Sequence, residues 1–299
     1  MGMNFFPSRH RHCSGCLERK IKVGNEEVIE YYHRGVVCHL IGLELAIPLD
    51  VEPIRPGEGE VIAAKRLAER VFGNYSRFFE AVVADALYME GPFFNFCLDR
   101  GKHIIAVLKG NNKSLLEDAR GLFSDTEPKT WQRQHCSIQY WHAEGFKAES
   151  IDVPLRVLHT EETHHKRKRI ASQWVEKTEK QSWWWATTIP EKQLSTHQLW
   201  QAGHKRWDIE NGNFNTLGRD WSLNHCFKHD PIAITNFVLT LFITFVLVQS
   251  FYYRNLKPQM RALFGTLISI TDELYASLYQ NSFHTSSVKC LANPPPQSV

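Results

Sequence analysis

Two acidic residues of this 299-residue chain lie where a carboxylate could take part in chemistry. Glu210 lies between Trp207 and Phe214 in the stretch RWDIENGNFN, and Asp85 directly follows the apolar stretch FEAVVA. A carboxylate among apolar side chains costs free energy unless a cation binds it. Two such carboxylates side by side would form a hard oxygen site for Mg²⁺ or Mn²⁺. Sites of this kind usually serve phosphoryl transfer.

Each residue also has a simpler interpretation. Glu210 and Arg206 could form a surface ion pair worth a few tenths of a kcal/mol, and Asp85 could only cap the helix that follows it. The spacing around Glu210 favours an inward position, because residues three and four apart share one face of a helix. We therefore expect a single helix whose inward face carries Trp200, Gly203, Trp207, Glu210, Phe214 and Leu217.

The elements that must position Asp85 follow from the first 113 residues. Residues 19–48 run as alternating and apolar stretches with a turn at Gly24-Asn25, which predicts strands. A helical period follows from residue 56, then a buried strand over 79–84, a short helix closed by Gly101, and the buried strand HIIAVLKGNN. This order predicts a mixed sheet covered by helices, with Asp85 at a strand end where sites form.

Residues 114–190 differ in character, with short strand-like stretches and polar turns. They include the basic run HHKRKR at 164–169, set among aromatic residues. That combination is typical of surfaces that follow a phosphate backbone and stack on bases. Trp183, Trp184 and Trp185 alternate at strand spacing, so each face of the strand should carry at least one. An exposed one would be a candidate for stacking on an unpaired base.

The pair Cys13 and Cys16 has the spacing of zinc ligands, with His10 and His12 beside it. A structural zinc site needs a second ligand pair, usually at a defined spacing. None is evident, although His33, Cys38 and His39 follow nearby in the sequence. A loop with reduced thiols is the favoured interpretation, and zinc is the alternative.

Composition limits the other possibilities. The formal net charge of +3 does not by itself indicate a nucleic-acid partner. Seven scattered cysteines suit a reducing cytosol, and the N-terminal stretch lacks the continuous apolar region of a signal peptide. Residues 232–253 are long and apolar enough to span a membrane, but several polar residues interrupt them. A buried core helix is favoured, and a membrane span stays open.

Four stretches occur in an order that resembles the core of bacterial DDE transposases of the insertion-sequence-four type: VVADALYMEGPF, HIIAVLKGNN, SWWWATTIP and RWDIENGNFNTLGRDWSLNHCFKHDPIAI. The resemblance covers about residues 5–255. It implies an RNase H-like fold interrupted by a β-rich insertion, with Asp85 and Glu210 as the second and third catalytic acids. They would bind Mg²⁺ or Mn²⁺ together with a first Asp. It also implies DNA as the partner, a homodimer on paired transposon ends, and a cytoplasmic protein without stable membrane association.

The same resemblance assigns the basic residues. Arg206 matches the arginine of the family's Tyr-Arg-Glu-Lys motif, whose tyrosine would fall at Gly203 and whose lysine would fall at or near Gly218. The expected DNA-contacting residues are Arg206, Arg219, Lys109, Lys166, Arg167, Lys168, Arg169 and Trp184. Met1 stands where the first Asp belongs, so the opening strand would precede residue 1. We expect weak or no strand cleavage from this polypeptide alone.

The expected organisation has four parts. Residues 1–113 form the first part of the catalytic core, residues 114–190 the DNA-contacting insertion, residues 191–285 the Glu210 helix and C-terminal helices, and residues 286–299 a disordered tail. Three other interpretations remain. One is a noncatalytic DNA-binding remnant of a transposase, and another is a single-span membrane protein built around residues 232–253. The third is nuclease activity without integration.

Overall fold

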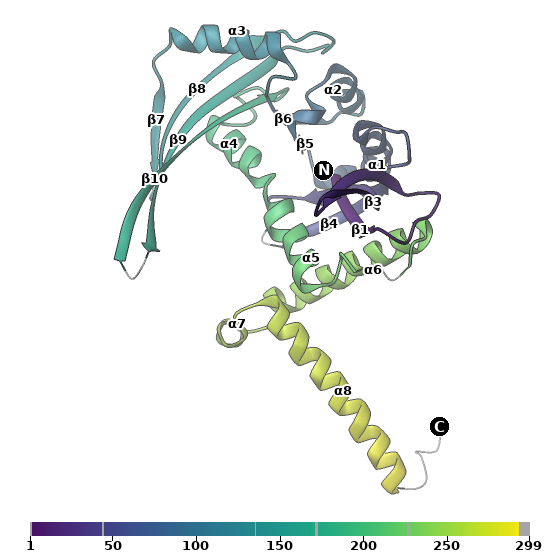
Figure 1. The fold of residues 1–299 in the computed structure, drawn as a ribbon. Coiled ribbons are helices and arrows are strands. Elements are labelled where there is room, and N and C mark those ends of the chain that lie inside the picture. Colours follow the sequence, from purple (N-terminus) through teal and green to yellow (C-terminus); the bar gives the residue numbers. More distant parts are fainter. Residues whose placement is uncertain (1, 44, 135, 171–172, 226–227, 293–299) are drawn as a thin grey trace.

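The structure, a computed structural model, describes residues 2–43, 45–134, 136–170, 173–225 and 228–292. Within these ranges it leaves the side chains of 168–170, 173–174, 211–213 and 280–292 undescribed. Its strands form two sheets that lie side by side, and its C-terminal helices extend away from them (Figure 1). Asp85 and Arg206 line a cavity that lies between the two sheets.

The first sheet is antiparallel and contains β1 (Gly2–Ser8), β2 (Leu17–Val23), β3 (Glu26–Leu40) and β4 (Ile47–Pro53). The predicted turn at Gly24-Asn25 is confirmed, with Gly24 at a φ of 63° that glycine adopts without strain. β1 pairs with one edge of β3 as far as Val36, while β2 and β4 pair with the other edge. Among the described residues, no strand pairs with the β1 edge of β3 beyond Val36.

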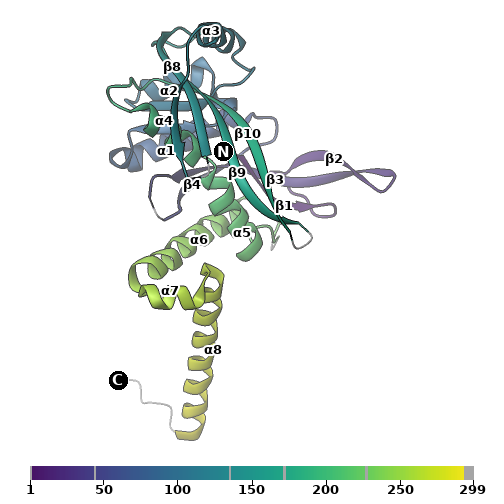
Figure 2. The same cartoon turned by 90° about the vertical axis from the view of Figure 1, so that its left-hand side faces the viewer.

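The second sheet has six strands in the order β5-β6-β10-β9-β8-β7. They are β5 (Ala81–Ala84), β6 (His103–Val107), β7 (Lys129–Arg133), β8 (Cys136–Phe146), β9 (Leu155–Ile170) and β10 (Gln173–Thr187). β5 and β6 are parallel and the other neighbours are antiparallel, so the sheet is mixed as predicted. This α/β architecture is consistent with an RNase H-like fold. The β9–β10 hairpin extends beyond the body of the sheet (Figure 2).

Helices cover these sheets. α1 (Glu60–Tyr75) buries Ala64, Leu67 and Val71 at the predicted helical period. A 3-10 turn (Ser76–Phe78) leads into β5, and another (Ala86–Tyr88) leads from β5 to α2 (Gly91–Leu98). α3 (Lys113–Ser124) is amphipathic, and its Phe123 packs into the hydrophobic core to which α1 and α2 also contribute.

The strand-like stretches predicted within residues 114–190 are present as β7, β8, β9 and β10. The sequence pattern did not predict α3, whose apolar residues recur at helical spacing over 113–124. β10 pairs with β6 through Trp185 and Val107, so these strands continue the sheet that carries Asp85. The bounds of the expected insertion stay a prediction.

The expected single helix around Glu210 is also corrected. α4 (Thr196–Lys205) starts at a capping box of Ser195 and Gln198 and is followed by a π-helical segment (Ile209–Phe214) and α5 (Asn215–Asp220). A π-turn holds more residues than an α-turn, so the 3.6-residue period does not continue through Glu210. The side chain of Glu210 is half-buried, with 29% of its surface exposed.

The apolar segment forms α6 (Pro231–Ser250), continued by a π-helical turn (Phe251–Asn255). Residues 231–255 are long and apolar enough to cross a membrane, and an 18-residue window within them has a mean hydropathy of 2.2. One face of α6 packs on the first sheet through Ile234, Val238 and Phe245, and Gln249 hydrogen-bonds to both backbone polar groups of Ala46. The expectation of a core helix holds for this face, while Ile243 and Leu247 on the other face are exposed.

The chain ends in α7 (Pro258–Phe264) and α8 (Leu267–Ala292), and α8 projects away from the two sheets (Figure 1). The helix continues past residue 286, where the sequence predicts the start of a disordered tail. Residues 293–299 of that expected tail lie outside the described residues.

Candidate active site

Asp85 lies at the end of β5, where the apolar strand meets the first helical turn. Its Oδ1 accepts a hydrogen bond from the Ala86 backbone N–H at 2.7 Å, so it does cap that turn. The side-chain amide of Asn111 donates to the Ala86 carbonyl, which ties the loop after β6 to the loop after β5. Asp85 Oδ2 faces Arg206, and 37% of the side chain is exposed.

Arg206 lies at the end of α4 with only 4% of its side chain exposed. Its Nη1 is 3.9 Å from Asp85 Oδ2 and 3.4 Å from Glu210 Oε1. The guanidinium also lies over the ring of Trp207 at 4.2 Å. The structure therefore brings the three residues together, with a buried cation between the two carboxylates.

Glu210 reaches Arg206 from the π-helical segment. In that segment the backbone N–H of Asn215 donates to the carbonyl of Glu210, the spacing of a π-turn. Such wide turns are rare and occur often at functional sites, where they redirect a side chain. Arg206 and Glu210 are four residues apart, and the wide turn begins at the carbonyl of Glu210.

The donor set has the chemistry of a site for a hard divalent cation. Carboxylate oxygens are the ligands that Mg²⁺ and Mn²⁺ prefer, and both Asp85 and Glu210 keep solvent-exposed oxygen surface. In the part of the chain that the structure describes, neither belongs to a group of three or more ligand residues. The two acids fit a metal ion, and a further oxygen donor would complete the set.

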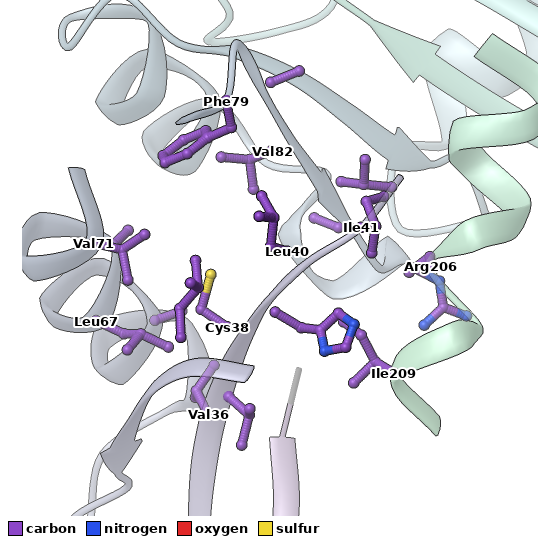
Figure 3. A pocket seen from close by; sticks show the side chains of 18 of the residues that line it. Val36, Cys38, Leu40, Ile41, Leu67, Val71, Phe79, Val82, Arg206 and Ile209 are labelled. Carbon is purple, nitrogen blue, oxygen red and sulfur yellow. The ribbon is translucent and has the colours of Figure 1, made fainter. Parts of the chain in front are cut away.

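An apolar slot of about 340 Å³ lies beside these acids, between β3 and β5 (Figure 3). Residues 36–41 line one side, residues 79–85 line the other, and Leu67 and Val71 of α1 close the base. Arg206 and Ile209 lie at the end of the slot. Within the described chain β5 pairs only with β6, so the wall of the slot that β5 forms is an edge strand of the second sheet.

A family model for the transposase DDE domain matches residues 24–247. The chain belongs to this family. No curated protein matches it. The matched region contains Asp85, Arg206 and Glu210, and it covers β3 and β4 of the first sheet, the whole second sheet and most of α6.

The sequence pattern did not predict a polar network that is centred on Glu60. Glu60 accepts hydrogen bonds from the Gly2 backbone N–H at 2.9 Å and from the Tyr88 hydroxyl at 2.7 Å, and it pairs with Arg34 at 2.6 Å. Burial, together with the Glu60 charge, raises the pKa of Tyr88, so the hydroxyl stays protonated as a donor. A Cβ at Gly2 would lie 2.3 Å from Glu60 Oε2, so a larger residue there would displace the Glu60 carboxylate. The network fixes the start of β1.

A second network joins the β9–β10 hairpin to α4. Glu162 is 1% exposed and accepts hydrogen bonds from Trp200 Nε1 at 2.8 Å and from Thr160 at 3.0 Å. His204 Nε2 lies 2.8 Å from the same carboxylate. Burial raises the pKa of Glu162, but the hydrogen bonds from His204 and Trp200 outweigh burial and lower it overall. The buried carboxylate thus positions the helix that ends in Arg206.

The departure from the family's tyrosine also has a structural reason. Gly203 packs directly on the indole of Trp185, which is 1% exposed. A Cβ at position 203 would lie 2.4 Å from Trp185 Nε1. The transposase therefore has no room for a tyrosine side chain here.

The expected DNA-contacting cations lie in several places. Lys109 is exposed after β6, at the same end of the sheet as Asp85. Arg219 is exposed and pairs with the adjacent Asp220 at 2.6 Å. Lys166 and Arg167 are exposed on β9 and pair with Glu179 at 2.7 Å and Glu176 at 3.1 Å on β10. The side chains of Lys168 and Arg169 lie outside the described residues.

The three tryptophans alternate across β10 as expected. Trp185 is buried and Trp183 stacks beside it at 6.0 Å, with Trp207 at 5.8 Å from Trp183. Trp184 lies on the other face, half-buried against His159 at 3.8 Å and Phe123 at 5.9 Å. Trp183 is therefore the one that contacts the Arg206 region, and a DNA contact of Trp184 stays a prediction.

Proposed function

We propose that this transposase domain carries out metal-dependent strand cleavage and strand transfer at transposon ends, as in the insertion-sequence-four type. Asp85 and Glu210 would hold Mg²⁺ or Mn²⁺. The single observation that carries the proposal is that both carboxylates contact the same Arg206 nitrogen. The bound metal would supply Lewis-acid activation of the attacking water or 3′-hydroxyl.

The chain's own residues then have distinct tasks. Arg206 is held by burial and by Trp207, so it presents a fixed positive charge to a phosphate that reaches the two acids. Lys109 lies at the same sheet end and would contact the neighbouring backbone phosphates. Exposed Trp183 surface beside Trp207 would stack on a base next to the cut. The basic run at 164–169 and Arg219 would bind DNA farther from the cut.

The slot suggests where the third acid belongs. A strand that continues β1 toward its N-terminal side would run antiparallel to β3 along residues 37–40, which line the slot. It would occupy the apolar space beside Asp85, between β3 and β5. We propose that such a strand carries the first Asp, at the position of Met1, and that paired DNA ends bring two chains together.

The test extends the chain by an apolar strand that ends in Met1→Asp, with Met1→Asn in the same extension as the matched control. The substrate is DNA from the flanks of this reading frame, with Mn²⁺ or Mg²⁺. We expect metal-dependent nicking from the Asp form and at least about 10²-fold less from the Asn form, because a lost ligand removes several kcal/mol of charge stabilisation. Equal nicking by the two forms would contradict the proposal.

We also propose a cytoplasmic, DNA-bound protein without stable membrane association. Its support is the packing of α6 on the first sheet, where Gln249 is held by Ala46. The noncatalytic alternative predicts DNA binding without nicking in the same assay. Recovery of the chain in the membrane fraction would favour the single-span alternative.

A further inference from the structure

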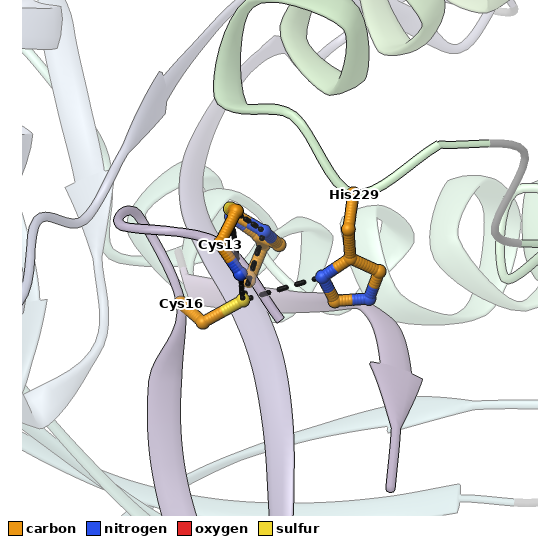
Figure 4. Close-up of side chains that lie close together, drawn as sticks. Cys13, Cys16 and His229 are labelled. Atoms are coloured by element: carbon orange, nitrogen blue, oxygen red, sulfur yellow. Dashed lines mark hydrogen bonds between the residues drawn. The ribbon is translucent and has the colours of Figure 1, made fainter. Parts of the chain in front are cut away.

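Four potential metal ligands converge at a point that the strand-cleavage chemistry does not use (Figure 4). Cys13 and Cys16 come from the loop between β1 and β2, and His33 comes from β3. His229 comes from the segment before α6, far along the chain. Their ligand atoms all lie within 4.8 Å of one another.

The distances are those of a tetrahedral zinc site. With Zn–S near 2.3 Å and Zn–N near 2.0–2.1 Å, two sulfurs lie ~3.8 Å apart and a sulfur and a nitrogen ~3.6 Å apart. The two Sγ atoms are 3.7 Å apart. His33 Nε2 lies 3.3 Å from Cys13 Sγ and 3.4 Å from Cys16 Sγ, and His229 Nδ1 lies 3.2 Å from Cys16 Sγ.

The surroundings prepare these atoms for a metal. His229 Nε2 is 3.1 Å from the Phe6 carbonyl, so Nε2–H donates there and Nδ1 keeps its lone pair toward the cluster. This is the usual arrangement for a metal-bound histidine. The backbone N–H of Cys13 donates to Cys16 Sγ at 3.3 Å, which stabilises a thiolate. Cys16 and His33 are buried.

A disulfide does not explain the cluster. Its S–S bond would be about 2.05 Å long, whereas the two sulfurs are 3.7 Å apart and two imidazole nitrogens approach them. His10 and His12, which flank the pair in sequence, are exposed and do not belong to the cluster. The second ligand pair therefore comes from β3 and from the segment before α6.

We propose that Cys13, Cys16, His33 and His229 bind one Zn²⁺ in a closed structural site. Four protein ligands leave no open coordination position, so the site is not catalytic. Thiolates favour zinc over Mg²⁺ and Mn²⁺, so this site and the carboxylate site select different metals. The zinc joins the first sheet to the segment that follows Glu210 and α5, and it thereby fixes α6 against β1 and β3.

The test begins with the metal content of the purified chain, measured by mass spectrometry without added metal. We expect one zinc per chain, and in the cobalt-substituted protein the thiolate-to-cobalt charge-transfer band and the visible bands of a tetrahedral site. Zinc content well below one per chain, or a cobalt spectrum without the thiolate band, would overturn the proposal. Neither readout needs a variant that folds, and neither depends on strand cleavage.

Variants then assign the ligands. Cys16→Ser and His229→Ala should each weaken zinc binding by more than the ~10- to 100-fold that loss of an outer partner costs. His12→Ala is the control for a neighbouring histidine. Cys136→Ser is the control for the other cluster, formed by Cys136, Glu162 and His164. Full zinc content in Cys16→Ser, or its loss in Cys136→Ser alone, would assign the zinc elsewhere and overturn the proposal.

Discussion

Arg206 Nη1 lies 3.9 Å from Asp85 Oδ2, across the boundary between the end of β5 and the end of α4. The same nitrogen lies 3.4 Å from Glu210 Oε1, so one buried cation holds both acids at one side of the sheet. Removing a buried cation that faces two carboxylates leaves like charges opposed. The geometry makes Arg206 a structural residue of this site, and we predict a functional role as well.

Arg206→Lys should reduce strand cleavage about 10²-fold or more in the chain extended by the strand that ends in Met1→Asp. Lysine lacks the planar guanidinium group that can contact two carboxylates and a phosphate at once. DNA binding should change much less, because many other cations contribute to it. Arg77→Lys, at an exposed position, is the matched control. Nicking rates and DNA affinities measured on the same preparations separate the two effects, and an unchanged rate in Arg206→Lys would contradict the role.

Gly203→Ala should destabilise the fold by about 1–3 kcal/mol, because its Cβ would meet Trp185 Nε1 in a packed core. Gly121→Ala is the control, since no atom lies within 4 Å of a Cβ at that exposed helical position. The control should stabilise by about 0.5–1 kcal/mol. Urea unfolding measures both, and a Gly203→Ala protein as stable as the parent would show that Trp185 can move aside.

Glu162→Gln should lower the free energy of unfolding at neutral pH by about 1–3 kcal/mol, because the buried hydrogen bonds lose their charge. The pKa of Glu162 is lowered in the fold, so its contribution is present above the unfolded pKa of about 4.3. That contribution is lost as the pH falls through the folded pKa. The difference between parent and variant should therefore shrink below about pH 4.

Glu176→Gln is the control for that experiment, because its pair with Arg167 is exposed. Its effect should stay within about 0.5 kcal/mol at any pH. Unfolding curves at several pH values test both variants. A difference between parent and Glu162→Gln that grows toward acid pH would have the wrong sign for this account.

Local patterns predicted much of the fold. The turn at Gly24-Asn25, the period of α1, the apolar strand before Asp85 and the short helix α2 all depend on neighbouring residues, and all are present. The resemblance to DDE transposases placed Asp85, Arg206 and Glu210 in one site, and the structure brings them together. Their roles stay predictions, as do the DNA contacts.

Some features that the sequence did not predict depend on residues far apart in the chain, and others are local. The π-helical turn after Arg206 does not follow from the spacing of Trp207 and Phe214, which also suits an α-helix. The pairing of β10 with β6 joins segments far apart, which no local period reports. The sequence did not predict that His229 lies beside Cys13 and Cys16, because His229 is 213 residues from Cys16 along the chain. The helical period of α3 is short and adjoins polar stretches that resemble strands, so it was not predicted.

The shared metal site of Asp85 and Glu210 is tested most directly by localised cleavage of the protein backbone. Fe²⁺ with ascorbate and peroxide generates radicals at a bound metal, and the fragment ends then show where it binds. We predict cleavage beside both Asp85 and Glu210, suppressed by excess Mg²⁺ and lost in Asp85→Asn and Glu210→Gln. Cleavage that avoids one of these two positions, or that persists unchanged in Asp85→Asn, would contradict the account.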